Sequence, residues 1–281
     1  MAEEKTIDEY FLSRDFVDIN RLNLQHYLYR DIFGYNLHPN IPIQNTPNLS
    51  VVDVGAGTAV WLRDLHATLD PTTQYLGLDI DTRQAGPPEW LPPNCTVRQW
   101  DATTDIPIDL LGRFDVVNLR LFGLVIKESP KPLLRKLIKL LKPGGYIQWC
   151  ETDQLSHRVQ AADPSLPTEN LTELWRQTTL IAPKLMAPWV KSLPKDFEEE
   201  GLEDVVADWK TGSQHTLVAM HWCNMPLYEM IEHQLRATYA EKAALFRRLI
   251  QASIQESSAG AMYVFDRVVV VGRKSHETRT G

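Results

Sequence analysis

Three aspartates in the first half of the chain, Asp53, Asp79 and Asp101, each stand at or near the end of a run of strand length. The first of these runs leads into a loop that contains Gly55 and Gly57, and then into a helical pattern. A carboxylate can accept hydrogen bonds from ribose hydroxyls or from an adenine amine. Because open α/β sheets bind their ligands at the carboxyl ends of the strands, these residues predict a site for a nucleoside.

The glycine loop differs from the loops that bind phosphate groups. A dinucleotide-binding loop has a third small residue three positions after its second glycine, whereas this chain has Val60 there, followed by Trp61. The branched side chain should keep a pyrophosphate away from the helix N-terminus, which argues against an NAD-dependent oxidoreductase. A P-loop is also excluded, because no Gly-Lys-Ser/Thr follows. What remains is a ligand with a nucleoside but no phosphate.

The elements that would position these residues alternate between strands and helices. Strand patterns occur at residues 49–55, 73–80, 95–101, 114–122 and 146–153, and helical patterns at residues 59–69 and 130–145. Such alternation predicts a parallel sheet with right-handed crossover connections.

The segments on either side of this alternation are mostly helical. Helical patterns occur at residues 5–36, 167–183, 187–201 and 216–258, and further strand patterns at residues 202–212 and 261–274. The long helical segment directly before the last strand is where we expect a lid over a substrate.

Five segments resemble, in order, the motifs of class I S-adenosylmethionine-dependent methyltransferases. They are "VVDVGAGTAVWL", "YLGLDID", "PPEWLPPNCTVRQWD", "FDVVNLRLF" and "LLKPGGYIQWCETD". The proline-rich third segment and "RLNLQHYLYRDIFGYNLHPNIP" resemble the branch found in fungal secondary-metabolite gene clusters. The resemblance covers about residues 15–155.

This resemblance implies a Rossmann-like class I methyltransferase fold with a seven-stranded, mostly parallel sheet. It implies a helical cap at residues 1–48 and a methyltransferase domain at residues 49–281, with lid helices at about 155–200 and 216–258. It also implies S-adenosyl-L-methionine as the cofactor and S-adenosyl-L-homocysteine as the product. The implied cofactor-binding residues are Asp53, Gly55, Gly57, Asp79, Ile80, Asp101, Ala102, Asn118 and Arg120.

The resemblance also implies roles for individual residues. Asp79 would bind the ribose, and Asp101 would hold the edge of the adenine. Asn118 and Arg120 would lie near the carboxylate of the cofactor or near the substrate. Ala59 stands where many members of the family have glycine, and its methyl group should tighten the loop slightly.

Methyl transfer is an in-line displacement, to which alignment and the exclusion of water contribute most. An oxygen or nitrogen acceptor can also need a base, most often a histidine or a carboxylate. Glu151 ends the fifth predicted strand, His26 lies in the N-terminal cap, and His221 lies in the predicted lid. These three residues are the candidate catalytic residues.

Aromatic and sulfur-containing side chains suit the wall of an apolar substrate pocket. The candidates are Tyr10, Trp149, Met186, Trp222 and Met225. Two of them belong to "HWCNMPLY", near the start of the predicted lid.

Charge and cysteine content argue against several classes of function. The net charge is −7, and no stretch supplies the basic face that nucleic-acid binding requires. The three cysteines are far apart and form no disulfide or metal-binding pattern. No apolar run reaches the ~18 residues of a membrane span, and the acidic N-terminus has no signal-peptide pattern. We therefore expect a cytoplasmic protein without a metal, nucleic-acid or membrane partner.

The residues leave three functions open. The first is a methyltransferase of class EC 2.1.1 that modifies an oxygen, nitrogen or sulfur atom of a small-molecule secondary-metabolite intermediate. The second is a non-methylating member of the same fold, a cyclase or pericyclase assisted by the cofactor. The third is a regulatory pseudo-methyltransferase that acts through partners. The sequence decides neither the substrate nor whether a homodimer forms.

Overall fold

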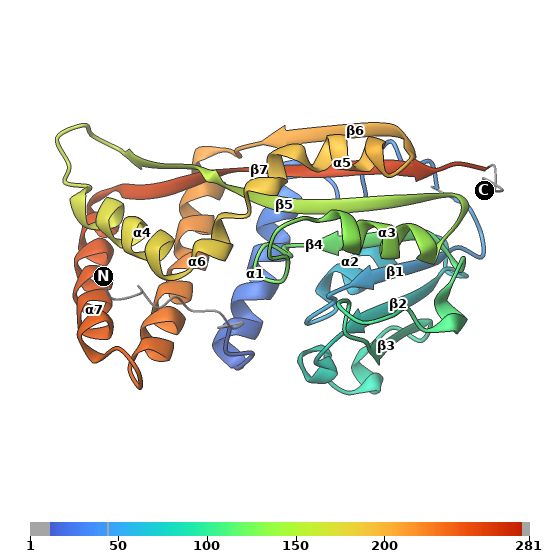
Figure 1. Cartoon of the computed structure of the whole chain (residues 1–281), viewed down its shortest axis with the longest axis horizontal. Helices are drawn as coiled ribbons and strands as arrows, with labels where there is room; N and C mark the ends of the chain where they lie inside the picture. The colour runs from blue at the N-terminus through green and yellow to red at the C-terminus, as the bar shows by residue number, and fades with distance from the viewer. Residues whose placement is uncertain (1–11, 44, 277–281) are drawn as a thin grey trace.

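The computed structural model describes residues 12–43 and 45–276, which contain one sheet of seven strands (Figure 1). The strand order is β3-β2-β1-β4-β5-β7-β6. The strands are β1 (Ser50–Val54), β2 (Gln74–Asp79), β3 (Cys95–Gln99), β4 (Phe114–Arg120), β5 (Leu141–Ala161), β6 (Leu202–Lys210) and β7 (Ala261–Lys274). Strands β1 to β5 pair in parallel, whereas β7 is antiparallel to β5 and β6. The predicted Rossmann-like fold is confirmed.

Helices cover both faces of the sheet. The α-helices are α1 (Phe16–Phe33), α2 (Val60–His66), α3 (Lys131–Leu140), α4 (Glu169–Ile181), α5 (Leu193–Glu199), α6 (Gln214–Leu235) and α7 (Ala240–Ala259). Short 3-10 helices lie at Thr82–Ala85, Pro88–Trp90, Ile108–Leu110, Pro183–Met186 and Pro188–Ser192. In one core layer Leu134 of α3 and Phe197 of α5 are buried, and in the other Tyr29 of α1 and Trp61 of α2. Among the residues described, no helix has the length and apolarity to cross a membrane.

Strand β5 is longer than its sequence pattern predicts. The predicted strand ends at Asp153, whereas β5 continues to Ala161. After an irregularity between Asp153 and Arg158, its last residues pair with the start of β7, where Ala161 lies opposite Ala261. The extra length was missed because residues 154–160 are mostly polar and only partly buried, so that the apolar strand signal stops.

The lid helices α4, α6 and α7 pack on this extension of β5 and β7 (Figure 1). Their common core includes Leu174, Ile231 and Phe246 from the helices, together with Tyr263 and Phe265 from β7. The helical segment predicted before the last strand is therefore present as α6 and α7. The division into a cap at residues 1–48 and a domain at residues 49–281 stays a prediction.

Helix α1 buries an unusually polar face. Asp15 caps its first turn through two backbone amides, and Gly34 ends it with a left-handed φ of 80°. Between these caps the buried side chains include Arg21, Gln25 and His26, which recur at helical spacing. Figure 1 shows α1 between the sheet and the lid helices. Because buried polar groups need hydrogen-bond partners, the position of α1 depends on specific polar contacts.

A carboxylate from another helix holds the N-terminus of α4. Thr168, at the cap position, makes no side-chain hydrogen bond to the helix. Instead, Glu256 of α7 accepts hydrogen bonds from the backbone amides of Asn170, at 2.9 Å, and Leu171, at 2.8 Å. Glu256 is buried, so this contact satisfies amides that would otherwise lack a partner and joins two lid helices.

Replacing Glu256 with alanine should lower the free energy of unfolding by about 2–3 kcal/mol, because buried amides lose a charged acceptor. Urea denaturation followed by tryptophan fluorescence measures the change. The neighbouring Gln255 is exposed, and Gln255→Ala is the matched control, with an expected effect within about 0.5 kcal/mol. Equal stability of the two variants would show that Glu256 does not hold α4.

Candidate active site

A cavity of about 440 Å³ lies at the carboxyl end of the parallel strands, within the roughly 300–1,000 Å³ typical of small-molecule sites. Its lining comes from the loops after β1, β2, β3 and β4, from β5, and from α1, α4, α6 and β7. The cavity therefore joins the predicted nucleoside site to a chamber beneath the lid helices.

The glycine loop and Asp79 form one unit at this cavity. Gly55 and Gly57 have φ values of 72° and 51°, in the region that favours glycine. A Cβ atom at Gly55 would clash with the ring of Phe122, so a larger residue there would require that side chain to move. The Oδ2 atom of Asp79 accepts a hydrogen bond of 2.8 Å from the amide of Gly57. Each carboxylate oxygen has two lone pairs, so Asp79 retains acceptor capacity for a ligand.

The start of α2 agrees with the exclusion of a dinucleotide. Val60 lines the cavity at the position where a dinucleotide loop requires a small residue. Ala59 has a left-handed φ of 57° and is fully buried. Glycine adopts a left-handed φ more easily than alanine, which explains why many members of the family have glycine where this chain has Ala59.

The loop after β3 presents Asp101 to the same cavity. Its Oδ1 atom accepts hydrogen bonds from the amide of Thr103, at 2.8 Å, and from its hydroxyl, at 2.7 Å. The backbone hydrogen bond from Thr103 is the main cause that lowers the pKa of Asp101, so the carboxylate is ionised at neutral pH. Ile80 and Ala102 also line the cavity, beside Asp101 and Asp79.

Two of the nine predicted cofactor residues lie outside the cavity lining. Asp53 is buried within β1, and the amide of Asn118 donates a hydrogen bond of 2.7 Å to its carboxylate. Gln148 donates in turn to the oxygen of Asn118 at 3.0 Å. Burial raises the pKa of Asp53 to about 6, despite the opposing charge of Arg120. Asp53 and Asn118 thus bind each other within the sheet, outside the cavity lining, and their part in cofactor binding stays a prediction.

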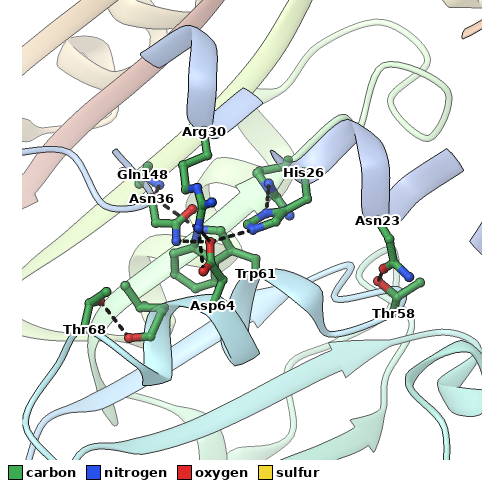
Figure 2. Close-up of polar contacts among 11 residues, drawn as sticks. Asn23, His26, Arg30, Asn36, Thr58, Trp61, Asp64, Thr68 and Gln148 are labelled. Carbon is green, nitrogen blue, oxygen red and sulfur yellow. Dashed lines mark hydrogen bonds and ion pairs between the residues drawn. The ribbon is translucent and has the colours of Figure 1, made fainter. Parts of the chain in front are cut away.

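His26 lines the cavity, but both of its ring nitrogens have partners. Nδ1 lies 3.1 Å from a guanidinium nitrogen of Arg120. Nε2 lies 2.9 Å from a carboxylate oxygen of Asp64 (Figure 2). Burial, followed by the charge of Arg120, lowers the pKa of His26 to about 4. His26 is therefore neutral at physiological pH and engaged in holding its neighbours, which makes it a poor candidate for a free general base.

Glu151 is the candidate catalytic residue whose geometry suits a base. Its side chain is buried and lines the cavity. The Oε1 atom accepts hydrogen bonds from the amide of Phe122, at 2.7 Å, and from the indole of Trp149, at 2.8 Å. Burial raises the pKa of Glu151 to about 7, although these hydrogen bonds oppose the shift. A carboxyl group with this pKa can exchange a proton near neutral pH.

His221, the third candidate catalytic residue, lies in the packing between α6, α7 and β7. Its Nε2 atom is 2.8 Å from the hydroxyl of Ser257, and its Nδ1 accepts a hydrogen bond of 3.4 Å from the amide of Tyr263. The cavity lining does not include His221. The structure therefore places His221 in the packing of the lid and outside the cavity lining, and a catalytic role for it stays a prediction.

The substrate-pocket residues predicted from sequence are not those that line the chamber. Trp149 packs in the sheet core against Trp189, with ring centroids 5.8 Å apart. Met225 lies in the lid core, while Met186 and Trp222 are likewise outside the lining. Tyr10 lies outside the described residues. The chamber is lined instead by Leu124, Trp175, Thr178, Leu185, Leu227, Tyr228, Ile231, Tyr263 and Phe265.

Helical spacing explains why α6 presents different residues from those predicted. Its cavity-lining side chains are Asn224, Leu227, Tyr228 and Ile231, which follow the i, i+3, i+4, i+7 pattern of one helix face. Met225 is one position away from this face and points into the lid core. The spacing was visible in the sequence, but which face of α6 meets the cavity was not.

Comparison with known proteins agrees with this geometry. Residues 51–145 match the family model described as a methyltransferase domain. The chain is 34% identical over 155 residues to N-methyltransferase tcpN of Claviceps purpurea, covering 54% of this chain and 55% of that protein. It is 33% identical over 186 residues to methyltransferase grgD of a Penicillium species, covering 63% of this chain and 64% of that protein.

Among solved structures, phosphoethanolamine N-methyltransferase 2 of Haemonchus contortus, in complex with S-adenosyl-L-methionine, superposes with a TM-score of 0.50 and 15% identity. The match covers 95% of this chain and 60% of that chain, and at this identity it shows the fold alone. The chain spans roughly half to two thirds of the two curated relatives, both from fungi. Residues 51–145 carry, as the motifs predicted, a methyltransferase domain, and the strand order of the sheet is that of the class I fold.

Proposed function

We propose that the protein is an S-adenosylmethionine-dependent methyltransferase that modifies a nitrogen atom of a small-molecule intermediate in fungal secondary metabolism. One observation carries this proposal. A single cavity is lined by the glycine loop with Asp79 and Asp101, by the aromatic chamber under the lid, and by the buried carboxyl group of Glu151. The choice of nitrogen rests on the name of the relative tcpN, an N-methyltransferase.

The donor and acceptor groups at the loop end fit the cofactor. Asp79 has lone pairs left for ribose hydroxyls, Asp101 is an ionised acceptor for the adenine amine, and Arg120 is a cation suited to a carboxylate. The positive φ values of Gly55 and Gly57 let the backbone approach a ligand closely. Bound S-adenosylmethionine supplies an electrophilic methyl group on a sulfonium sulfur.

The lid end of the cavity would hold and dehydrate the acceptor. Trp175, Tyr228 and Phe265 offer aromatic and apolar surface, on which an organic substrate can displace water. A nitrogen nucleophile would attack the methyl carbon through its lone pair, so that the N–C bond forms while the S–CH3 bond breaks and S-adenosylhomocysteine is released. The nitrogen then has one proton to lose. The ionised carboxylate of Glu151 accepts that proton, and the hydrogen bonds from Phe122 and Trp149 hold it in place.

Replacing Asp79 with alanine should weaken S-adenosylhomocysteine binding at least about tenfold, because ribose contacts and the anchor of the Gly57 amide are lost together. Isothermal titration calorimetry measures the dissociation constant. Asp70→Ala is the matched control, since Asp70 is partly exposed and its carboxylate accepts hydrogen bonds from the neighbouring Thr72, in the loop before β2. Equal affinities of the two variants would contradict the proposed ribose site.

The reaction rate should depend on the ionisation of Glu151. With a pKa of about 7, the carboxyl group is protonated at lower pH, so the rate should fall about tenfold per pH unit below that value. Glu151→Gln should remove this dependence and lower kcat roughly 100-fold or more. Release of S-adenosylhomocysteine with a panel of secondary amines and amides measures both effects. A Gln variant with the rate and pH profile of the wild type would exclude Glu151 as the base.

The same group should make the fold less stable at high pH. The pKa of Glu151 is about 7 in the folded protein, against 4.5 for an exposed glutamate, so its contribution to stability is full below about pH 4.5 and is lost as pH rises toward 7. Glu151→Gln removes this loss, and the variant should gain up to about 3 kcal/mol over wild type between pH 4.5 and pH 8. Urea denaturation at both pH values tests this without a substrate. A pH-independent difference would contradict the raised pKa.

A further inference from the structure

Asp64 of α2 gathers three side chains from α1 and the segment after it (Figure 2). Its carboxylate lies 2.9 Å from Nε2 of His26 and 2.7 Å from Nη1 of Arg30. It also accepts a hydrogen bond of 2.5 Å from the amide of Asn36. Burial opposes its ionisation, but the hydrogen bonds from Asn36 and His26 and the charge of Arg30 keep the pKa of Asp64 low. Asp64 is therefore an ionised anchor between α1 and α2.

The contact with Arg120 determines which nitrogen of His26 carries the proton. An arginine side chain has only hydrogen-bond donors, so Nδ1 of His26 must accept from Arg120. In a neutral imidazole the other nitrogen is then protonated, and Nε2 donates to Asp64. Asp64 thus favours the tautomer in which His26 can accept a hydrogen bond from Arg120.

A neutral partner orients Arg120 without compensating its charge. In the described part of the chain, Arg120 lines the cavity, and its side chain donates a hydrogen bond to His26. The charge of Arg120 lowers the pKa of Asp53, but the carboxylate of Asp53 accepts its hydrogen bond from Asn118 rather than from Arg120. By contrast, Arg21, another cation of the lining, is paired with Asp18 at 2.7 Å. Arg120 therefore keeps its charge available to an anionic group in the cavity.

We propose that Asp64 and His26 are positioning residues that hold the guanidinium of Arg120 toward a carboxylate of the bound ligand. This contact would make the site prefer nucleosides with an amino-acid chain over nucleosides without one. The inference rests on the proposed function, because it assumes that the cavity binds S-adenosylmethionine and S-adenosylhomocysteine. Selectivity for the amino-acid chain then originates at Asp64, which lies in α2 and outside the cavity lining.

Two probes separate this role from general binding. S-adenosylhomocysteine carries the amino-acid chain, and 5′-methylthioadenosine carries the same adenosine without it. Calorimetric titration of the full chain with each gives a selectivity ratio. Asp64→Ala and His26→Leu should each lower this ratio about tenfold, as expected for a lost contact with a charged group. The affinity for 5′-methylthioadenosine should stay close to that of the wild type.

Two further variants distinguish positioning from structural damage. Arg30→Ala removes the outer ion pair of Asp64 but leaves the contact with His26, so its selectivity ratio should match the wild type. His26→Asn keeps an acceptor oxygen at about the position of Nδ1 and loses the contact with Asp64. It should retain most of the selectivity, and adding Asp64→Ala to it should cause no further loss. Thermal unfolding of each variant confirms that it is folded.

The outcomes are distinct. A wild type that binds neither probe overturns the proposed function and this inference with it. If both probes bind but Asp64→Ala and His26→Leu weaken them equally, the two residues only stabilise the fold, and the positioning role is wrong. An unchanged ratio in Asp64→Ala also overturns it. A loss restricted to S-adenosylhomocysteine, absent in Arg30→Ala, supports it.

Discussion

The polar docking of α1 onto α2 is the contact on which the cavity depends. Asp64 binds His26, Arg30 and Asn36, and the hydroxyl of Thr58, in the glycine loop, donates a hydrogen bond of 2.7 Å to Asn23 of α1 (Figure 2). Apolar contacts alone leave the rotation of a helix loosely specified, whereas buried hydrogen bonds require particular partners. The face of α1 that carries cavity-lining side chains is therefore held in one orientation. Because α1 forms part of the cavity wall, the shape of the cavity depends on this small set of polar contacts.

The second determinant is the extension of β5 and β7 beyond the sheet. It carries the lid helices, and Glu256 links α7 to the N-terminus of α4. Tyr263 and Phe265 of β7 belong both to the lid core and to the cavity lining. The chamber beneath the lid helices is thus lined by residues that also form the core of the lid. Changes that alter this packing should affect acceptor binding more than the nucleoside end, which is formed by the loops of the sheet.

Burial shifts the pKa of the candidate carboxyl group and the pKa values of the candidate histidines in opposite directions. It disfavours the charged form of any group, so it raises the pKa of Glu151 to about 7 and lowers the pKa of His26 to about 4. The same effect lowers the pKa of His221 to about 4. The carboxyl group therefore acquires a pKa suited to proton transfer at neutral pH, whereas the two histidines become neutral hydrogen-bonding groups. This contrast favours Glu151 over the histidines as the base.

The sequence by itself determined the alternation of strands and helices along the first half, the glycine loop and the aspartates at or just after the ends of β2 and β3, because these signals are local in the chain. Asp79 and Asp101 line the cavity for that reason. The extension of β5 and the residues of the acceptor chamber were decided only by the tertiary structure. The end of β5 could not be predicted because its residues are mostly polar and partly exposed. No local sequence pattern indicates which face of α6 lines the cavity. The partners of His26 are likewise distant in sequence, so its neutral state follows from the packing of α1 rather than from any motif.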